Sequence, residues 1–194
     1  MKLDHLKFPD YGWGYMPATE EMYNVFRYCE EKYHPTRVLE IGFHLGHSTT
    51  YQLEIYKSAR IVSVSPYIDN TPVSDRIDPA DRHRMAIKLA ELYPDRWMWI
   101  PGKSHIVEDE IKTFSYDFAL VDGSHAYGPA LCDIALCVRL GIKQFLIDNF
   151  DQHDVKRAFF DTPNLSLVKT FSYDQTFKGK TKTNQIALVE IDND

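Results

Sequence analysis

Three oxygen-bearing side chains stand directly after two apolar runs of the chain. Asp122 follows the run at 116–121, and Asp148 and Asn149 follow the run at 144–147. The carboxyl ends of parallel strands meet at one edge of a sheet, so these side chains are expected on one rim. Two carboxylates and an amide oxygen suit Mg²⁺ or Ca²⁺, with waters and a substrate completing the shell. Because each such residue alone is more often a cap or turn residue, a purely structural role stays open.

His125 lies three residues after Asp122, in the loop beside it. A histidine accepts a proton near neutral pH, so next to a hydroxyl held by a cation it could act as a general base. The alternative is a loop or N-cap histidine that bonds the backbone. The sequence has no G-x-S-x-G nucleophile motif, and its other histidines show no zinc-binding spacing.

A glycine turn (residues 42–46) follows an apolar run in RVLEIGFHLGHSTT, residues 37–50. The pattern predicts a strand at 38–41, a turn through Gly42 and Gly46, and a helix that Ser48 opens. Backbone N–H groups and the helix dipole could meet a ligand there, or the turn could simply be tight. It is neither the dinucleotide G-x-G-x-x-G motif nor a P-loop. Glu40, an acid in a buried strand, needs a partner, either a ligand ammonium or nearby backbone N–H groups.

Periodicity and turn residues predict the elements that carry these groups. Strands are expected at 38–41, 60–65, 97–100, 116–121 and 144–147, and helices at about 20–33, 48–57, 79–92, 106–112, 131–138 and 154–160. The stretches 165–173 and 184–191 suit a hairpin. This order predicts a Rossmann-like, doubly wound α/β fold with a mostly parallel seven-stranded sheet, helices on both faces and a C-terminal antiparallel hairpin. Residues 1–17 are expected to form an aromatic leader or lid, 67–78 a surface loop, and 18–194 a single domain.

Composition narrows the class of protein. The 194 residues are 44% hydrophobic and 26% charged, which is typical of one globular domain. A net charge of −6 argues against nucleic acid as a partner. No apolar run is long enough to cross a membrane and no signal peptide is recognisable, so a cytoplasmic protein is expected. The three cysteines are expected to be reduced core residues, and edge strands with an aromatic leader are compatible with a homodimer.

Three segments resemble the motifs of a known family. VLEIGFHLGHS resembles the first motif, E-x-G-x-x-x-G-x-S, of the class I S-adenosylmethionine (SAM)-dependent methyltransferases. FALVDGSHAYGPALCDI and FLIDN resemble their fourth- and fifth-strand motifs. The chain looks most like the metal-dependent small-molecule O-methyltransferases of the catechol and caffeoyl-CoA type. Its D-G-x-H-x-Y form is more similar to a related bacterial group, which includes enzymes that methylate sugar hydroxyls of natural products. The resemblance covers about residues 16–191.

The resemblance implies a role for each matching residue. His125 would be the catalytic base, and Asp122, Asp148 and Asn149 would be the metal ligands. Ser65 stands where the family usually has an acid that grips the cofactor ribose, and a serine can bond one hydroxyl there. Lys103 also departs from the family pattern. The implied cofactor-binding residues are Glu40, Gly42, Phe43, Gly46, Ser48, Ser65, Gly102, Lys103, Ser104 and Asp122.

The expected function is therefore SAM-dependent methylation of a hydroxyl group on a small molecule, assisted by Mg²⁺ or Ca²⁺. Two alternatives stay open: a methyltransferase of the same fold without a functional metal, and a non-catalytic protein that binds SAM or a nucleotide. Neither nucleic acid nor membrane is expected as a partner.

Overall fold

The computed structural model describes residues 19–66, 79–177 and 179–192. The predicted leader or lid and the predicted surface loop at 67–78 lie outside the described residues. The division into a leader and a single domain therefore stays a prediction.

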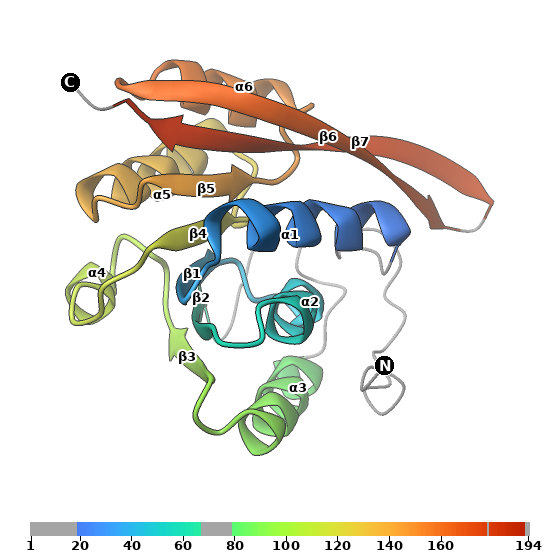
Figure 1. Cartoon of the computed structure of the whole chain (residues 1–194), viewed down its shortest axis with the longest axis vertical. Helices are drawn as coiled ribbons and strands as arrows, with labels where there is room; N and C mark the ends of the chain where they lie inside the picture. The colour runs from blue at the N-terminus through green and yellow to red at the C-terminus, as the bar shows by residue number, and fades with distance from the viewer. Residues whose placement is uncertain (1–18, 67–78, 178, 193–194) are drawn as a thin grey trace.

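The described residues form a seven-stranded sheet in the order β3-β2-β1-β4-β5-β7-β6 (Figure 1). Strands β1 to β5 run parallel, whereas β7 is antiparallel to both β5 and β6. This is the Rossmann-like fold of class I methyltransferases, and it confirms the predicted fold class. The strands are β1 (Arg37–Ile41), β2 (Arg60–Ser65), β3 (Trp97–Pro101), β4 (Phe118–Val121), β5 (Gln144–Ile147), β6 (Leu165–Phe177) and β7 (Lys180–Ile191).

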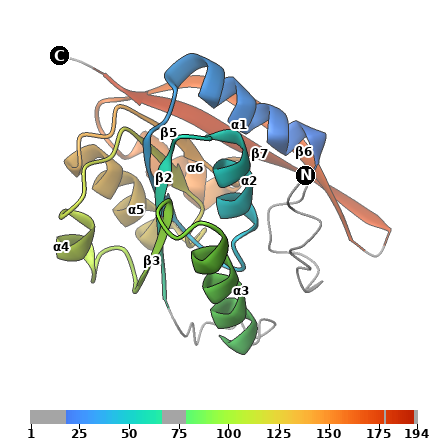
Figure 2. The same cartoon turned by 60° about the horizontal axis from the view of Figure 1, so that its bottom comes forward.

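Helices cover both faces of the sheet (Figures 1 and 2). One apolar core joins α1, α2 and α3 to the sheet, and a second core on the opposite face joins α4, α5 and α6 to it. The predicted start of the first helix is confirmed, since Thr19 accepts a hydrogen bond from the backbone N–H of Met22 (3.3 Å). The helices are α1 (Glu20–Tyr33), α2 (His47–Ile55), α3 (Pro79–Leu92), α4 (Glu108–Ile111), α5 (Tyr127–Arg139) and α6 (His153–Phe160).

Some predicted boundaries and one buried position differ from the structure. The fourth strand begins at Phe118 and not at 116, and just before it the Asp117 carboxylate accepts the backbone N–H groups of Thr36 and Arg37 at 3.0 Å. The hairpin strands are longer than predicted, since their polar ends show no apolar alternation but pair along the backbone. Cys132 is exposed, because it falls on the outer side of α5, whereas the other two cysteines are buried as expected.

The strand register brings the predicted site residues together. The last residues of β1, β4 and β5 are direct register partners. The backbone N–H of Gly42 donates to Val64 of β2 at 2.8 Å, which aligns the end of β2 with the same edge. The carboxyl edge of the sheet therefore carries Ser65, the last residue of β2, side by side with the residues that directly follow β1, β4 and β5, which are Gly42, Asp122 and Asp148.

Gly42 offers a test of this close approach. A Cβ atom there would lie 1.8 Å from the Asp122 carbonyl oxygen, and its φ of +108° is strained for any other residue. We expect Gly42→Ala to lower the free energy of unfolding by at least about 2 kcal/mol in urea denaturation.

Gly128→Ala is the matched control, because Gly128 lies in α5 with open space around it. It should raise stability by about 0.5–1 kcal/mol. Equal stability of the Gly42 variant and the wild type would contradict the packing described here.

Candidate active site

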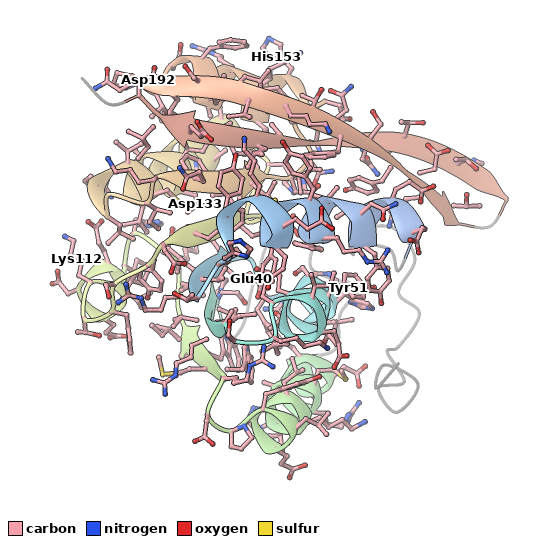
Figure 3. The ribbon with its side chains drawn as sticks, viewed as in Figure 1. Glu40, Tyr51, Lys112, Asp133, His153 and Asp192 are labelled. Carbon is pink, nitrogen blue, oxygen red and sulfur yellow. The ribbon has the colours of Figure 1, made fainter. Side chains whose placement is uncertain are left out.

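Glu40 lies in the middle of the sheet and is fully buried (0% exposed), next to the start of α2 (Figure 3). Its carboxylate accepts hydrogen bonds from Ser48 (2.6 Å), Gln52 (3.0 Å) and Ser63 (2.5 Å), and also from Thr49. The sequence suggests a ligand ammonium or backbone N–H groups as partners, but side-chain donors occupy that place. These donors come from the first turns of α2 and from β2. Their spacing in the sequence does not indicate that they meet at Glu40. Burial raises the pKa of Glu40, and the four hydrogen bonds oppose that effect.

The glycine turn is held from two sides. Gly42 and Gly46 both adopt positive φ angles (+108° and +80°), and Gly46 is the N-cap of α2. Arg82 of α3 donates to the carbonyl oxygens of His44 (3.1 Å) and Pro66 (2.7 Å), which ties the turn to the end of β2. The N–H groups of the first turn of α2 therefore face the carboxyl edge from a fixed position.

Phe43 and Ser48 contribute to this turn from inside the protein. The Phe43 ring is fully buried and lies 5.2 Å and 5.7 Å, centroid to centroid, from the rings of Trp97 and Trp99. The Ser48 hydroxyl is committed to Glu40. Both side chains thus stabilise the turn from inside the protein. Their backbone groups, and not their side chains, would contact a ligand at the carboxyl edge of the sheet.

Ser65 ends β2 with a buried hydroxyl that has no hydrogen-bond partner among the described residues. An unpartnered buried hydroxyl costs about 1–3 kcal/mol, so it favours a site that a ligand completes. The backbone oxygen of Ser65 accepts the N–H of Gly102 at 3.0 Å, which places the third-strand turn beside it. In that turn Lys103 is exposed, and Ser104 donates to the buried carboxylate of Asp133 in α5. The Ser104 side chain therefore anchors the turn to α5.

Asp122 and Asp148 bring two carboxyl groups together at the ends of β4 and β5. Asp148 is 5% exposed, and its two oxygens lie 2.9 Å and 3.1 Å from the donating hydroxyl of Tyr173 in β6. Burial raises the pKa of Asp122 to about 8, with a further contribution from the charge of Glu40, whereas a hydrogen bond to Asp148 opposes the rise. Burial and the charge of Asp122 likewise raise the pKa of Asp148. The pair therefore favours a shared proton or a bound cation over two free negative charges.

His125 faces this pair from the loop after β4. Its Nε2 lies 3.7 Å from Oδ1 of Asp122, and its Nδ1 lies 3.2 Å from the side-chain nitrogen (Nε2) of Gln152. Burial lowers the pKa of His125, although the charge of Asp148 opposes this. A neutral imidazole near pH 7 is the state that a general base requires.

The three predicted metal ligands can be tested for fit. Asp122 and Asp148 are adjacent, and Asn149 follows them with 9% exposure and a φ of +52°. The buried carboxyl group of Asp148, the partly exposed one of Asp122 and an asparagine next in the sequence are the residue types that suit a divalent cation completed by water and substrate. Histidine, cysteine and acidic side chains alone make no metal-binding group of three within the described part of the chain.

Three side chains around the site escaped the sequence argument. Tyr173 is buried in its strand, and the alternation of apolar and polar residues along that strand was the signal that could have placed it there. Gln152 stands in the loop after β5, and Asp133 in α5 has apolar neighbours at helical spacing. None belongs to a recognisable motif, because each acts through contacts between elements that are distant in the sequence.

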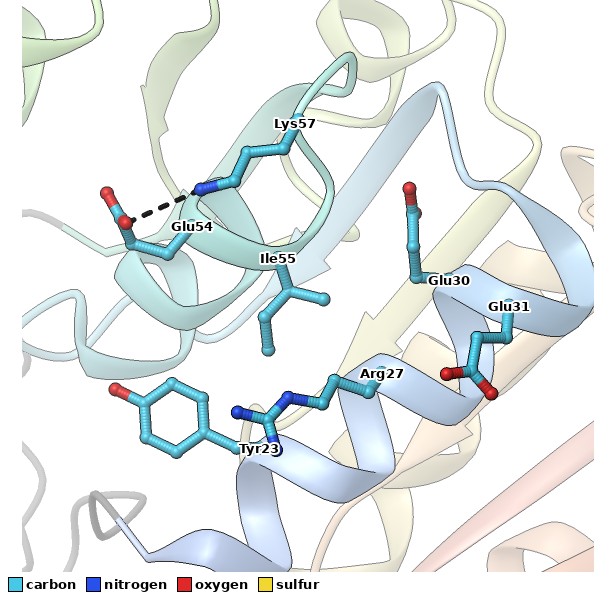
Figure 4. A pocket seen from close by; sticks show the side chains of 7 residues that line it. All are labelled: Tyr23, Arg27, Glu30, Glu31, Glu54, Ile55 and Lys57. Carbon is cyan, nitrogen blue, oxygen red and sulfur yellow. Dashed lines mark ion pairs between the residues drawn. The ribbon is translucent and has the colours of Figure 1, made fainter. Parts of the chain in front are cut away.

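A separate groove lies between α1 and the end of α2 (Figure 4). Both of its cations are paired, with Arg27 2.6 Å from Glu20 and Lys57 3.6 Å from Glu54. The lining residues are Tyr23, Arg27, Glu30, Glu31, Glu54, Ile55 and Lys57, and none of them stands at the carboxyl ends of the strands. The groove is therefore distinct from the candidate site.

The sequence matches the family described as "Methyltransferase domain" over residues 39–143, which is more than half of the chain. The chain belongs to this methyltransferase family. The match spans both the glycine turn and the D-G-x-H loop. It confirms the resemblance to class I methyltransferases that the motifs indicate.

Solved structures show the same fold. The O-methyltransferase TomG of Streptomyces achromogenes, involved in tomaymycin synthesis and solved with SAM, is 14% identical with a TM-score of 0.65, covering 91% of this chain and 82% of that one. An O-methyltransferase of Bacillus cereus solved with S-adenosylhomocysteine (SAH) is 15% identical with a TM-score of 0.64, covering 95% and 84%. No curated protein sequence matches the chain. Within the described residues, no helix has the length and apolarity needed to span a membrane.

The carboxyl pair predicts a pH dependence of stability. The pKa of Asp122 is about 8 in the folded protein, well above the ordinary value of about 4. The folded state thus binds more protons than the unfolded state between these values, and the free energy of unfolding should fall as pH rises from about 5 to about 8. We expect Asp122→Asn, measured in chelator, to match the wild type near pH 5 and to exceed its stability by roughly 1–3 kcal/mol near pH 8.

Asp109→Asn, at an exposed position of α4, should track the wild type at every pH. A constant difference between the Asp122 variant and the wild type across this range would show that Asp122 is already ionised in the folded protein.

Proposed function

We propose that this chain transfers the methyl group of SAM to a hydroxyl group of a small molecule, with a divalent cation assisting at the carboxyl edge. The observation that carries the proposal is the set of Asp122, His125 and Asp148, which stands beside the glycine turn at the edge where this fold binds ligands. An acid pair with a neutral histidine next to it suits the activation of a hydroxyl group.

SAM as the cofactor is supported by the family and by the fold. Two structures of the same fold contain SAM or SAH. In this chain the cofactor would contact the backbone of the glycine turn and the third-strand turn at Gly102 and Lys103. The unpartnered hydroxyl of Ser65 would accept or donate one hydrogen bond to the ribose, where a carboxylate would bond two hydroxyls.

Asp122, Asp148 and Asn149 would hold the cation. When bound, a divalent cation lowers the pKa of an acceptor hydroxyl and fixes its position. Tyr173 supports this arrangement, because its hydroxyl holds the Asp148 carboxylate in place from the C-terminal hairpin.

His125 would take the proton of the acceptor hydroxyl at Nε2. The acceptor oxygen forms its bond to the methyl carbon as the bond between that carbon and the SAM sulfur breaks, and SAH and the methylated acceptor leave. His125 then releases its proton to solvent, since its side chain is 39% exposed. Holding the two reactants in line accounts for much of the expected rate enhancement.

A methyltransferase without a metal is the second candidate. It is favoured by the hydrogen bond between Asp122 and Asp148 and by the Tyr173 hydroxyl, which satisfy the pair when it shares a proton. In that case the pair would contact an amine or hydroxyl of the substrate directly.

Cofactor binding can be tested first with SAH. We expect saturating SAH to raise the melting temperature of the wild type, and Ser65→Ala to weaken binding by about 3- to 10-fold in calorimetry, because one hydrogen bond is lost.

Ser58→Ala provides the control, since Ser58 is exposed in the turn before β2, at its far end. It should bind SAH like the wild type. A melting temperature that saturating SAH leaves unchanged would contradict the cofactor assignment and favour a protein that does not bind SAM.

Metal dependence separates the two candidate functions. We expect methyl transfer to stop in excess chelator and to return with Mg²⁺ or Ca²⁺. Asp148→Asn should abolish calorimetric binding of these ions and lower turnover by at least about 100-fold, because a ligand charge is removed, while SAH still binds.

Asp109→Asn should leave metal binding and turnover unchanged. Full activity in excess chelator would overturn the proposed role of a divalent cation. The second candidate function, a methyltransferase without a metal, would then be the one supported.

A further inference from the structure

We propose that the groove between α1 and the end of α2 binds a small organic dication, a linear diamine with two ammonium groups on a hydrocarbon chain. The groove lies away from the carboxyl ends of the strands, so the proposal goes beyond methyl transfer and does not depend on it. None of the lining residues belongs to the methyltransferase motifs of the sequence.

The groove has the size and length that such a ligand needs. Its volume is about 340 Å³, which lies within the range of small-molecule sites. Four lining side chains come from α1, and the others come from the end of α2 and the turn after it (Figure 4). Tyr23 and Glu30 stand seven positions apart on α1, so the groove runs about 10 Å along that helix.

Glu54 provides a carboxylate with a replaceable partner at one end of the groove. Its side chain is 13% exposed; one oxygen accepts a hydrogen bond from the Tyr93 hydroxyl, and the other lies 3.6 Å from Nζ of Lys57. Lys57 is 74% exposed, and the ion pair of so exposed a lysine contributes little stability. A ligand ammonium can therefore take the place of Lys57 beside Glu54.

Glu30 and Glu31 provide carboxylates at the other end. Neither forms an ion pair within the described part of the chain, and the nearby cation Arg27 is held at 2.6 Å by Glu20, which does not line the groove. Oε2 of Glu30 is buried and accepts no hydrogen bond from the described residues. A buried carboxylate oxygen without a donor is unfavourable, so this end favours a ligand that carries N–H groups.

Tyr23 is an independent sign that a ligand completes the groove. The side chain is 7% exposed, and its hydroxyl is buried with no hydrogen-bond partner among the described residues. In Figure 4 this hydroxyl lies at the end of the groove where Glu54 stands. Burial and the charge of Glu54 raise the pKa of Tyr23, whereas the charge of Arg27 lowers it. The charges that act on the hydroxyl are thus those of the groove, and its oxygen can accept a hydrogen bond from a ligand ammonium.

The middle of the groove is apolar. Ile55 stands between the two acidic ends (Figure 4), and it packs against the core as a partly buried side chain. A hydrocarbon chain would lie on Ile55 and on the ring of Tyr23, with one ammonium group at each acidic end. This order of acid, apolar side chain and acid favours a diamine over a metal ion or an anion.

Calorimetric titration with cadaverine, a linear diamine, tests the site in the full chain. At low salt we expect saturable binding of one molecule per chain. Pentylamine, which carries one ammonium group, should bind about 10-fold more weakly, and pentanediol, which carries none, should not bind.

Variants distinguish a built site from general attraction to an acidic protein. Glu30→Gln should weaken cadaverine binding by about 10-fold and Tyr23→Phe by about 3-fold. Tyr23→Phe should also raise the melting temperature by roughly 2–4 °C, because a buried hydroxyl without a partner is removed. Glu21→Gln is the matched control, since Glu21 is exposed on α1 and does not line the groove; it should bind cadaverine like the wild type.

Three results would overturn the proposal. They are absence of saturable cadaverine binding, equal affinity for pentylamine and cadaverine, and an equal loss of affinity in Glu21→Gln and Glu30→Gln, which would indicate attraction to the surface charge of α1. SAH binding and methyl transfer are measured separately at the carboxyl edge. Their absence would overturn the proposed function and leave the result at the groove unchanged.

Discussion

The contact between the Asp122 and Asp148 carboxyl groups constrains everything else at the carboxyl edge. Two acids from neighbouring parallel strands meet there, Asp148 buried and Asp122 partly exposed, and the charge of Glu40 further raises the pKa of Asp122. Such a pair is stable only with a proton or a cation between the groups. The elements around it supply what the pair needs: a donating Tyr173 hydroxyl on one side and a neutral His125 on the other.

The C-terminal hairpin is part of this arrangement. Only the end of β7 pairs with β5, and the rest of the hairpin continues past the carboxyl edge beside α1 (Figure 1). From there it holds the loop after β5 at Phe150 and Asp151 and reaches Asp148 through Tyr173. An antiparallel addition to a parallel sheet thus orders the residues proposed to do the chemistry.

The polar residues of the site fall into two groups with different surroundings. Ser48 and Ser104 satisfy the buried acids Glu40 and Asp133, so their side chains hold the scaffold together. The Ser65 hydroxyl instead has no hydrogen-bond partner among the described residues, and the His125 side chain is 39% exposed at the edge. The fold is shared with solved structures of only 14% and 15% sequence identity.

Local patterns in the sequence determined the order of strands and helices, the glycine turn and the placement of Asp122, His125 and Asp148 on one edge. They suffice because strand periodicity, turn residues and the rule for parallel strand ends are properties of short segments. Only the tertiary structure decided that four side chains surround Glu40, that Tyr173 holds Asp148 and that Gln152 meets His125. These contacts join residues from different elements, and their geometry depends on how the helices and the hairpin pack against the sheet, which no single segment specifies.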